Sequence, residues 1–356
     1  MSYNLTQRFS KERLDKMTSS SVEFDWRQAR FDAQSEGTRK ILSHIVHRDA
    51  SESIWFARQL EYVRPGLLEV LYPALIAKTL IPLETAIGPG ASMWTYRAYD
   101  KVGYAQLVED YAMDPPRADV KGIEQTQVIK PYGVMYGYNF QELRAGMLAG
   151  LPLDVRKAMA ARYAMELKID QIFFYGDKAG NLLGLLNQSN TQSFTVPNGV
   201  QGTKLWRNKS ADEIVLDMHN FVDNIVGASL GVYQPTTLLL PLKAYNIAAT
   251  KRMGDGSNQT CLAFFKETNP YIKEVIPTYR LDQSQSGNWG GSTGRMVCYE
   301  KSPERLVGLL PVEFEQLPVQ QEGYEYKTLC HMRTGGVVAM HPASISYGDG
   351  ITDSSD

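Results

Sequence analysis

Residues 93–134 mix apolar and polar positions in a way that predicts two strands joined by a long excursion. The outgoing limb is Met93–Asp100 and the returning limb is Val120–Val134. Aromatic residues stand beside charged residues in the first limb, and Ile and Val stand beside Glu, Gln and Lys in the second. Neither limb therefore has a fully apolar face. A two-stranded ribbon of this kind is marginal alone in water, so we predict that it needs a further packing surface, which a neighbouring molecule can supply.

The segment between the two limbs, Lys101–Asp119, combines acidic residues with the pair Pro115-Pro116. This composition is typical of a solvated excursion. We therefore predict that the ribbon projects from the body of the protein. Two alternatives stay open at this point, a long surface hairpin and a lid over an active site, because long loops are often functional.

A long helix is predicted over residues 152–175. Pro152 suits its first turn, Asp154 lies near the positive end of the helix dipole, and Gly176 ends it. At about 1.5 Å per residue the helix is roughly 36 Å long. Its apolar stripe is expected to be buried and its opposite face wet. The stripe comprises Leu153, Ala160, Ala164, Leu167 and Ile172, and the polar face comprises Arg156, Lys157, Arg162, Glu166, Lys168 and Asp170.

Shorter elements are expected on both sides of the ribbon and the long helix. Residues 1–54 offer little apolar surface to bury and are expected to form an extended arm with helical pieces. A capped helix is expected to begin near Ser51 and to end before Pro65. The elements expected downstream are a helix over 211–226, a strand over 236–240, a helix over 242–253 and return strands between 314 and 347.

Composition and charge exclude several classes of protein. The chain has 356 residues, of which 43% are hydrophobic and 21% charged, an ordinary globular composition with room for two or three domain-sized units. A formal net charge of -2 provides no basic field, so binding of nucleic acid by charge neutralisation is excluded. No signal peptide is expected at the start. The most apolar run, Leu67–Leu83, is too interrupted to cross a membrane.

The cysteines indicate a reducing compartment. Cys261, Cys298 and Cys330 are odd in number and lack the paired spacing of a zinc ribbon or a disulfide framework. Likewise, His44 and His47 have helical metal-ligand spacing but no third ligand nearby. We therefore expect no metal site.

Two glycine-rich patterns invite a catalytic interpretation, and neither has the context that it needs. Gly227–Gly231 places Ser229 in nucleophile-elbow spacing, but a helix precedes it and a strand follows, which is the reverse of the elbow. A helix cap and turn explain its two glycines. Gly287–Gly294 lacks the Gly-Lys-Ser/Thr of a phosphate loop. The acidic pair Glu109 and Asp110 lies where no burial raises a pKa for acid or base work. We expect no enzyme activity, no catalytic residue and no cofactor.

Several short sequence segments occur in an order that resembles a known protein family. Leu151-Pro152-Leu153-Asp154-Val155-Arg156-Lys157-Ala158 is followed by Lys168-Ile169-Asp170, Gly176-Asp177 and Gly184-Leu185-Leu186-Asn187. This order resembles tailed-phage major capsid proteins of the Hong Kong 97 type. Two further segments, 117–122 and 136–144, resemble a phage and prophage subgroup related to encapsulin-like capsid proteins. The resemblance is detailed from about Trp55 to Asn187 and rests on element order beyond that.

The resemblance implies an α+β fold of the Hong Kong 97 type. Its parts are an N-terminal arm, a projecting two-stranded extended loop, a long spine helix, a peripheral domain and an axial domain. The implied boundaries are 1–54 for the arm, 55–92 and 135–204 for the peripheral domain with the spine helix at 152–175, 93–134 for the extended loop, 205–315 for the axial domain, 316–348 for return strands of the peripheral domain and 349–356 for the tail.

The function implied is that of a major capsid protein, a structural protein that self-associates into pentamers and hexamers. These would close an icosahedral or prolate head around the double-stranded DNA of a tailed phage, by enclosure and not by specific binding. Scaffold, portal and decoration proteins are further expected partners, with the virion as the location and the host cytoplasm as the place of assembly; no membrane is involved. Arm residues expected at the subunit interface are Trp94, Tyr96, Tyr99, Tyr104, Arg117 and Lys121.

Two other interpretations compete with the phage shell. An encapsulin-like cellular compartment shares the architecture and holds enzyme cargo in place of a genome. A soluble α/β enzyme with a lid predicts a monomer or small oligomer. Lys101 and Lys121 lie in the arm, but no partner carboxylate for a covalent crosslink is identifiable, so no crosslinking is predicted.

Overall fold

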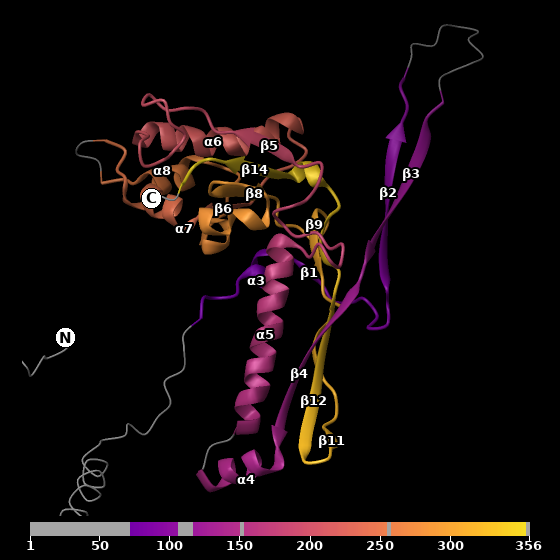
Figure 1. Ribbon diagram of the computed structural model, residues 1–356. Coiled ribbons are helices and arrows are strands. Elements are labelled where there is room, and N and C mark those ends of the chain that lie inside the picture. The colour runs from indigo at the N-terminus through magenta and orange to yellow at the C-terminus, as the bar shows by residue number, and fades with distance from the viewer. Residues whose placement is uncertain (1–71, 106–116, 150–152, 255–257, 354–356) are drawn as a thin grey trace, which may run out of the picture. The chain divides into compact units, whose positions relative to one another are not determined.

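The computed structural model describes residues 72–105, 117–149, 153–254 and 258–353 (Figure 1). Contacts divide the chain into two units, Met1–Tyr72 and Pro73–Asp356. Apart from Tyr72, the described residues belong to the second unit. The predicted arm at 1–54, the helix near Ser51, His44, His47, Glu109 and Asp110 lie outside the described residues.

The predicted ribbon is present. Strands β2 (Met93–Val102) and β3 (Asp119–Val128) pair antiparallel over ten residues each, with Met93 opposite Val128 and Val102 opposite Asp119. The returning limb differs from the prediction, because the ribbon ends at Val128 and does not continue to residue 134. Ile129 is buried and its N–H donates to the Ser92 carbonyl at 2.9 Å. After this point the chain leaves the ribbon.

Residues after Ile129 form a strand of a different sheet. Strand β4 (Lys130–Asn139) pairs along its whole length with β12 (Glu325–Thr334), so the limb that looked continuous in sequence serves two sheets. On the other edge of β12 lie β10 (Val312–Gln316) and β11 (Gln320–Glu322). The inward side chains of β4 pack against the main core, which helix α5 helps to form, and the short helix α4 (Phe140–Ala149) follows β4.

The long helix is confirmed as α5, Leu153–Tyr175, but its buried face agrees with the predicted stripe only in part, at the fully buried Ile172. Ala161, Met165, Ile169 and Phe173 are buried at intervals of four residues, whereas Ala160 and Ala164 are exposed. Alanine occurs on several faces of this helix, so its positions do not show which face is buried. The large apolar residues in the C-terminal half of the helix determine the buried face.

Asp170, expected on the wet face of α5, is 3% exposed. Its Oδ2 lies 2.6 Å from Nη2 of the buried Arg280, and its Oδ1 accepts from the Ala77 N–H at 3.0 Å. Ala77 begins the short helix α3 (Ala77–Leu80). The carboxylate therefore joins three segments that are far apart in sequence, and its burial follows from the partner that only the tertiary structure brings to it.

A five-stranded sheet has the order β5 (Gln192–Thr195), β14 (Ile345–Asp349), β8 (Arg295–Tyr299), β6 (Thr237–Pro241) and β7 (Glu274–Thr278). Leu238 and Leu240 of β6 join one core cluster and Leu239 joins the other. Side chains of a strand alternate between the faces of a sheet. The continuous aliphatic run predicted at 236–240 is thus a strand that is buried on both faces.

Helices α6 (Ala211–Ala228), α7 (Leu242–Thr250) and α8 (Cys261–Thr268) contribute to the cluster on one face of this sheet. The predicted helix over 211–226 is confirmed, and the one predicted over 242–253 ends three residues early at Thr250. A capping box begins α6, since the Ser210 side chain accepts from the Glu213 N–H and the Glu213 carboxylate accepts from the Ser210 N–H.

The sheets do not follow the implied domain boundaries at 204, 315 and 348. Strand β5 lies before residue 205 and β14 lies after residue 315, yet both belong to the five-stranded sheet. Strand β9 (Leu306–Leu309) lies inside the span 205–315 and instead pairs with β1 (Leu83–Glu84) and β13 (Gly336–Ala339). Long-range strand pairing decides these boundaries, and no local pattern in the sequence encodes it.

Candidate assembly interface

The root of the ribbon is fastened to its own subunit. Trp94 and Tyr96 are half-buried and pack against a small core cluster of Val307, Leu309 and Val338. Their rings lie 5.5 Å apart between centroids. Tyr96 also donates from its hydroxyl to Oε1 of Gln125 at 2.5 Å across the ribbon. Two of the six arm residues expected at a subunit interface thus have packing partners inside the same chain.

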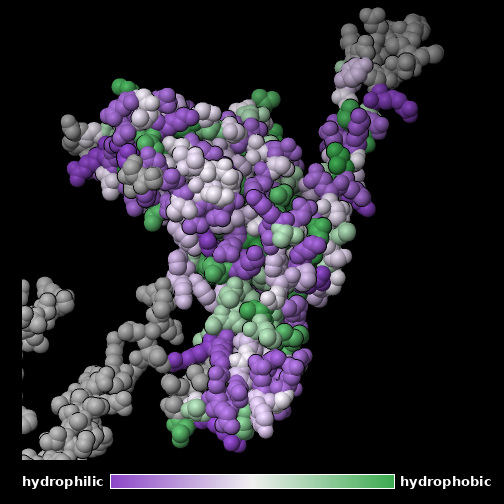
Figure 2. Space-filling model, in the orientation of Figure 1, coloured by the Kyte–Doolittle hydropathy of each residue, from purple (hydrophilic) through white to green (hydrophobic). Residues whose placement is uncertain are grey.

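Beyond Tyr96 the ribbon carries apolar side chains in the open. Tyr99 is 69% exposed, Val120 60% and Ile123 58%. Figure 2 shows hydrophobic residues along this part of the molecule among hydrophilic ones. Tyr104 is 72% exposed, and Arg117 and Lys121 are exposed as well. The four remaining interface candidates therefore lie where another molecule can reach them.

Polar cross-strand pairs hold the two limbs of the ribbon together. Arg97 Nε lies 2.6 Å from Oε1 of Glu124, and the hydroxyls of Thr95 and Thr126 are 3.0 Å apart. Each such pair contributes roughly 0.2–1 kcal/mol. The ribbon is thus internally braced without an apolar face, which agrees with the sequence pattern and leaves its apolar side chains available for contact.

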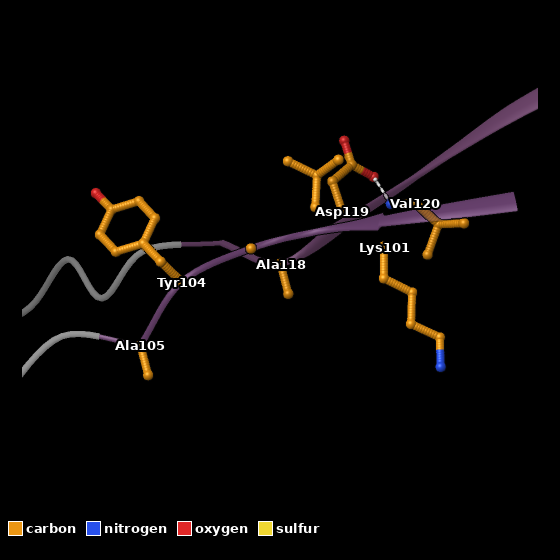
Figure 3. Close-up of a pocket in the computed structure, with 8 residues that line it drawn as sticks. Lys101, Tyr104, Ala105, Ala118, Asp119 and Val120 are labelled. Atoms are coloured by element: carbon orange, nitrogen blue, oxygen red, sulfur yellow. Dashed lines mark hydrogen bonds between the residues drawn. The ribbon is translucent and has the colours of Figure 1, made fainter. Parts of the chain in front are cut away.

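An open pocket of about 530 Å³ lies at the described end of the ribbon (Figure 3). Lys101 and Tyr104 point away from each other there, and Asp119 Oδ1 accepts from the Val120 N–H at 2.8 Å. Aliphatic and aromatic side chains dominate the lining, with Lys101 and Asp119 as its charged groups. Such a lining suits contact with a protein surface. The residues that line it are Lys101, Val102, Gly103, Tyr104, Ala105, Ala118, Asp119 and Val120.

The segments Gly176-Asp177 and Gly184–Asn187 form a clasp, a close crossing of two backbone segments directly after α5. Gly176 has φ +72°, a conformation that favours glycine, and a Cβ there would collide with the Leu182 carbonyl. A Cβ on Gly184 would lie 2.6 Å from the Phe174 carbonyl oxygen and closer still to the Gly176 nitrogen. Asn187 accepts from the Gly184 N–H at 2.6 Å and donates to the Tyr175 carbonyl at 2.8 Å. The two glycines and Asn187 therefore allow the backbone at 174–176 to pass close to the backbone at 184–187.

Asp177 connects this clasp to β4. Its Oδ2 accepts a 2.7 Å hydrogen bond from the Tyr132 hydroxyl and lies 3.5 Å from Lys168 Nζ. The hydrogen bond from Tyr132, with a smaller contribution from the charge of Lys168, lowers the pKa of the Asp177 carboxyl. The same environment raises the pKa of the Tyr132 hydroxyl, because its burial and the neighbouring carboxylate both oppose ionisation.

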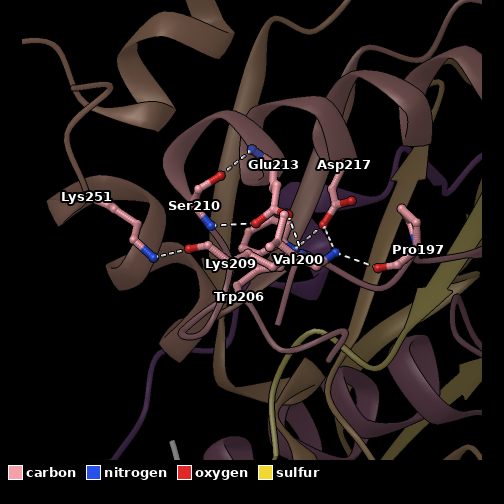
Figure 4. A network of polar contacts seen from close by, with 8 residues as sticks. All are labelled: Pro197, Val200, Trp206, Lys209, Ser210, Glu213, Asp217 and Lys251. Atoms are coloured by element: carbon pink, nitrogen blue, oxygen red, sulfur yellow. Dashed lines mark hydrogen bonds and ion pairs between the residues drawn. The ribbon is translucent and has the colours of Figure 1, made fainter. Parts of the chain in front are cut away.

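A buried ion pair fixes the start of α6 (Figure 4). Lys209 Nζ lies 2.5 Å from Asp217 Oδ2 and also donates to the Pro197 carbonyl at 2.7 Å; both charged side chains are at most 2% exposed. Trp206 Nε1 donates to the same Asp217 oxygen at 3.1 Å. Burial raises the pKa of the Asp217 carboxyl, and Lys209 and Trp206 oppose that shift. The loop that precedes α6 is thereby tied to the helix.

The patterns that invited catalysis have structural explanations. Ser229 is the C-cap of α6, so a helix does precede it, as the sequence indicated. Residues 283–288 form a 3-10 helix, and Trp289 stacks on Tyr175 at 6.1 Å between ring centroids. Within the described ranges no group of three His, Cys, Asp or Glu residues is placed to hold a metal, and Cys261, Cys298 and Cys330 are buried free thiols. No helix of the described residues is both long and apolar enough to span a bilayer.

The fold places the chain in a class. A long spine helix beside an antiparallel sheet, a second sheet with its own helices and an exposed two-stranded ribbon are the parts of the Hong Kong 97-type capsid fold. The family described as major capsid protein matches residues 103–351. The chain belongs to this major capsid protein family.

Solved structures share the fold at low sequence identity. The capsid of Myoviridae phage XM1 superposes with a TM-score of 0.72 at 18% identity, covering 83% of this chain and 98% of that one. A chain of Mycobacterium phage Cain superposes with a TM-score of 0.56 at 16% identity, covering 83% of this chain and 95% of that one. The capsid of a native GTA particle superposes with a TM-score of 0.57 at 11% identity, covering 82% of this chain and 95% of that one. No curated protein matches the sequence.

Proposed function

We propose that this capsid protein forms pentamers and hexamers that close the head of a tailed phage. The observation that supports this most directly is the ribbon, whose root is packed inside its own subunit while Tyr99, Val120 and Ile123 stand exposed beyond it. Apolar side chains on a ribbon that has no core of its own gain stability only from a further surface. In a shell, a second copy supplies that surface at every position.

The two larger sheets support a division of the subunit into two domains with different roles in the shell. In this proposal α5 is the spine of the peripheral domain, together with the sheet of β4 and β12. The five-stranded sheet with α6 to α8 is the axial domain, which meets its counterparts around the axes of the pentamers and hexamers. Because β5 and β14 belong to that sheet, the axial domain comprises residues from two separate parts of the chain, one from β5 to β8 and the other at β14.

The contents of the shell follow from charge. With a net charge of -2 the subunit has no overall positive field, so double-stranded DNA is held by enclosure and not by binding to the wall. Scaffold, portal and decoration proteins remain proposed partners, with assembly in the host cytoplasm. The proposal includes no enzyme activity and no covalent crosslinking between arms.

Assembly of the purified full chain tests the proposal. Size-exclusion chromatography followed by negative-stain electron microscopy is expected to show rings or closed particles. A stable monomer across the accessible protein concentrations would contradict it. Nucleic acid content of particles from infected or induced cells separates a phage head from a cellular compartment, since a compartment would carry protein cargo.

A further inference from the structure

The turn that ends α6 is a Schellman motif with an unusual occupant. The Leu230 N–H donates to the Gly227 carbonyl at 3.2 Å, and the Gly231 N–H donates to the Val226 carbonyl at 2.8 Å. Leu230 occupies the position after the cap, with φ +51°. This is the left-handed region in which glycine is strongly favoured, because a side chain crowds the backbone there.

Among the described residues, the leucine side chain has no packing that offsets this strain. Leu230 is 94% exposed and Val232, two residues further on, is 63% exposed. A Cβ added at Gly227 or at Gly231 would have no neighbour within 4 Å among the described residues. A glycine at position 230 would relax the backbone at no cost in described packing.

The turn is nevertheless held rigidly. Ser229 donates from its hydroxyl to the Val226 carbonyl at 3.2 Å and accepts from the Tyr233 N–H at 3.1 Å. The Tyr233 ring lies under the Arg305 guanidinium at 5.1 Å and beside His341. The apolar side chain of Leu230 is therefore displayed from a fixed support. Preorganised apolar groups of this kind lose little entropy on binding.

We infer that Leu230, with Val232 beside it, is an interface anchor that docks on a second copy of this chain. The inference rests on the proposed shell function. The turn lies inside the span that matches the major capsid protein family, and it ends α6, a helix of the proposed axial domain, which in the proposed shell meets its counterparts in other subunits. A ring contact is heterologous, so the turn of one subunit meets a different surface of the next.

Two glycine variants of the full chain separate this role from a structural one. Leu230→Gly removes the side chain and relaxes the backbone, so we expect the urea midpoint of the free subunit to stay the same or rise. The protein concentration needed for assembly is expected to rise roughly tenfold. Asn190→Gly is the matched control, because Asn190 is also exposed with φ +60° but presents no apolar group. It should leave assembly unchanged.

Thiol labelling reports on the contact itself. The three native cysteines are buried, so a maleimide should react mainly with the new thiol of Leu230→Cys. We expect fast labelling of the free subunit and a rate at least about tenfold lower in assembled particles. Slow labelling already in the free subunit would show that the chain covers the turn itself, which would overturn the inference.

The outcomes distinguish the two proposals. If the wild-type chain assembles and Leu230→Gly assembles at the same concentration, or if the thiol reacts equally fast before and after assembly, the anchor is wrong and the shell function stands. If the wild-type chain forms neither rings nor particles, the shell function fails and the anchor fails with it.

Discussion

The ring of Tyr99 lies over Gly122, its partner directly across the ribbon, so that a Cβ on Gly122 would stand 3.3 Å from Cε1 of the ring. Because glycine has no side chain, the ring can lie directly against the backbone of the opposite strand. With 69% of its surface still exposed, the ring is placed but not buried. An aromatic group held in this way is ready to contact another molecule at low entropic cost.

Replacement of Tyr99 should therefore affect assembly far more than folding. We expect Tyr99→Ala to change the free energy of unfolding of the free subunit by less than about 1 kcal/mol, the range of one cross-strand pair. Assembly should require a clearly higher protein concentration. Urea unfolding and light scattering measure the two effects. Equal assembly by Tyr99→Ala and wild type would remove Tyr99 from the interface.

The clasp after α5 predicts a strong difference between two glycines. Gly184→Ala should destabilise the subunit by about 2 kcal/mol or more, because its Cβ meets backbone atoms of Gly176 and Phe174 that cannot move aside. Gly227→Ala, in the last turn of α6 with open space around it, should stabilise by about 0.5–1 kcal/mol. Urea unfolding at equilibrium compares them. Similar midpoints for the two variants would mean that the crossing is not tight.

The buried ion pair predicts a strong single-site effect. Lys209→Met leaves the Asp217 carboxylate buried without its partner, which should cost about 3–5 kcal/mol of stability. The double variant Lys209→Met/Asp217→Leu should recover much of that loss, since no charge remains buried. Glu166→Gln, which breaks the partly exposed i,i+4 pair with Arg162, serves as the control and should cost less than about 0.5 kcal/mol. A double variant as unstable as the single one would show that packing, not charge, dominates this site.

The lowered pKa of Asp177 predicts a pH-dependent effect of Tyr132. Because the folded-state pKa lies below the unfolded value, this contribution to stability is present above about pH 4 and is lost as the pH falls through the folded-state pKa. Tyr132→Phe should therefore lower the urea midpoint more at about pH 7 than at about pH 2.5. Tyr136→Phe is the control, since Tyr136 bonds to Gln316 and not to a carboxylate. A loss that is the same at both pH values would contradict the assigned cause.

Sequence predicted the elements better than their partners. Local signals placed α5, α6, β6 and the ribbon, because capping residues, glycines and apolar runs act within a few residues. The end of the ribbon at Val128 and the burial of Asp170 could not be predicted in this way. Each depends on a segment from far along the chain, β12 in one case and Arg280 in the other.

The interface candidates show the same division. The aromatic residues of the arm are predicted interface residues, and their sequence pattern does not say which molecule each of them contacts. Trp94 and Tyr96 pack on Val307 and Leu309 of their own chain, a contact between strands about two hundred residues apart. The sequence does not single out Leu230, since a helix cap and turn explain the glycines around it. Its only sequence signal was a leucine where a helix end favours glycine.

In the proposed shell, the ribbon beyond Tyr96 is buried only by a second copy of the same chain. Electron cryomicroscopy of assembled particles, at a resolution that shows side chains, tests it most directly. We expect Tyr99 and Ile123 of each subunit to lie buried against a neighbouring subunit, at every position of the shell. A closed shell in which these side chains remain in solvent, or lie folded against their own subunit, would contradict it.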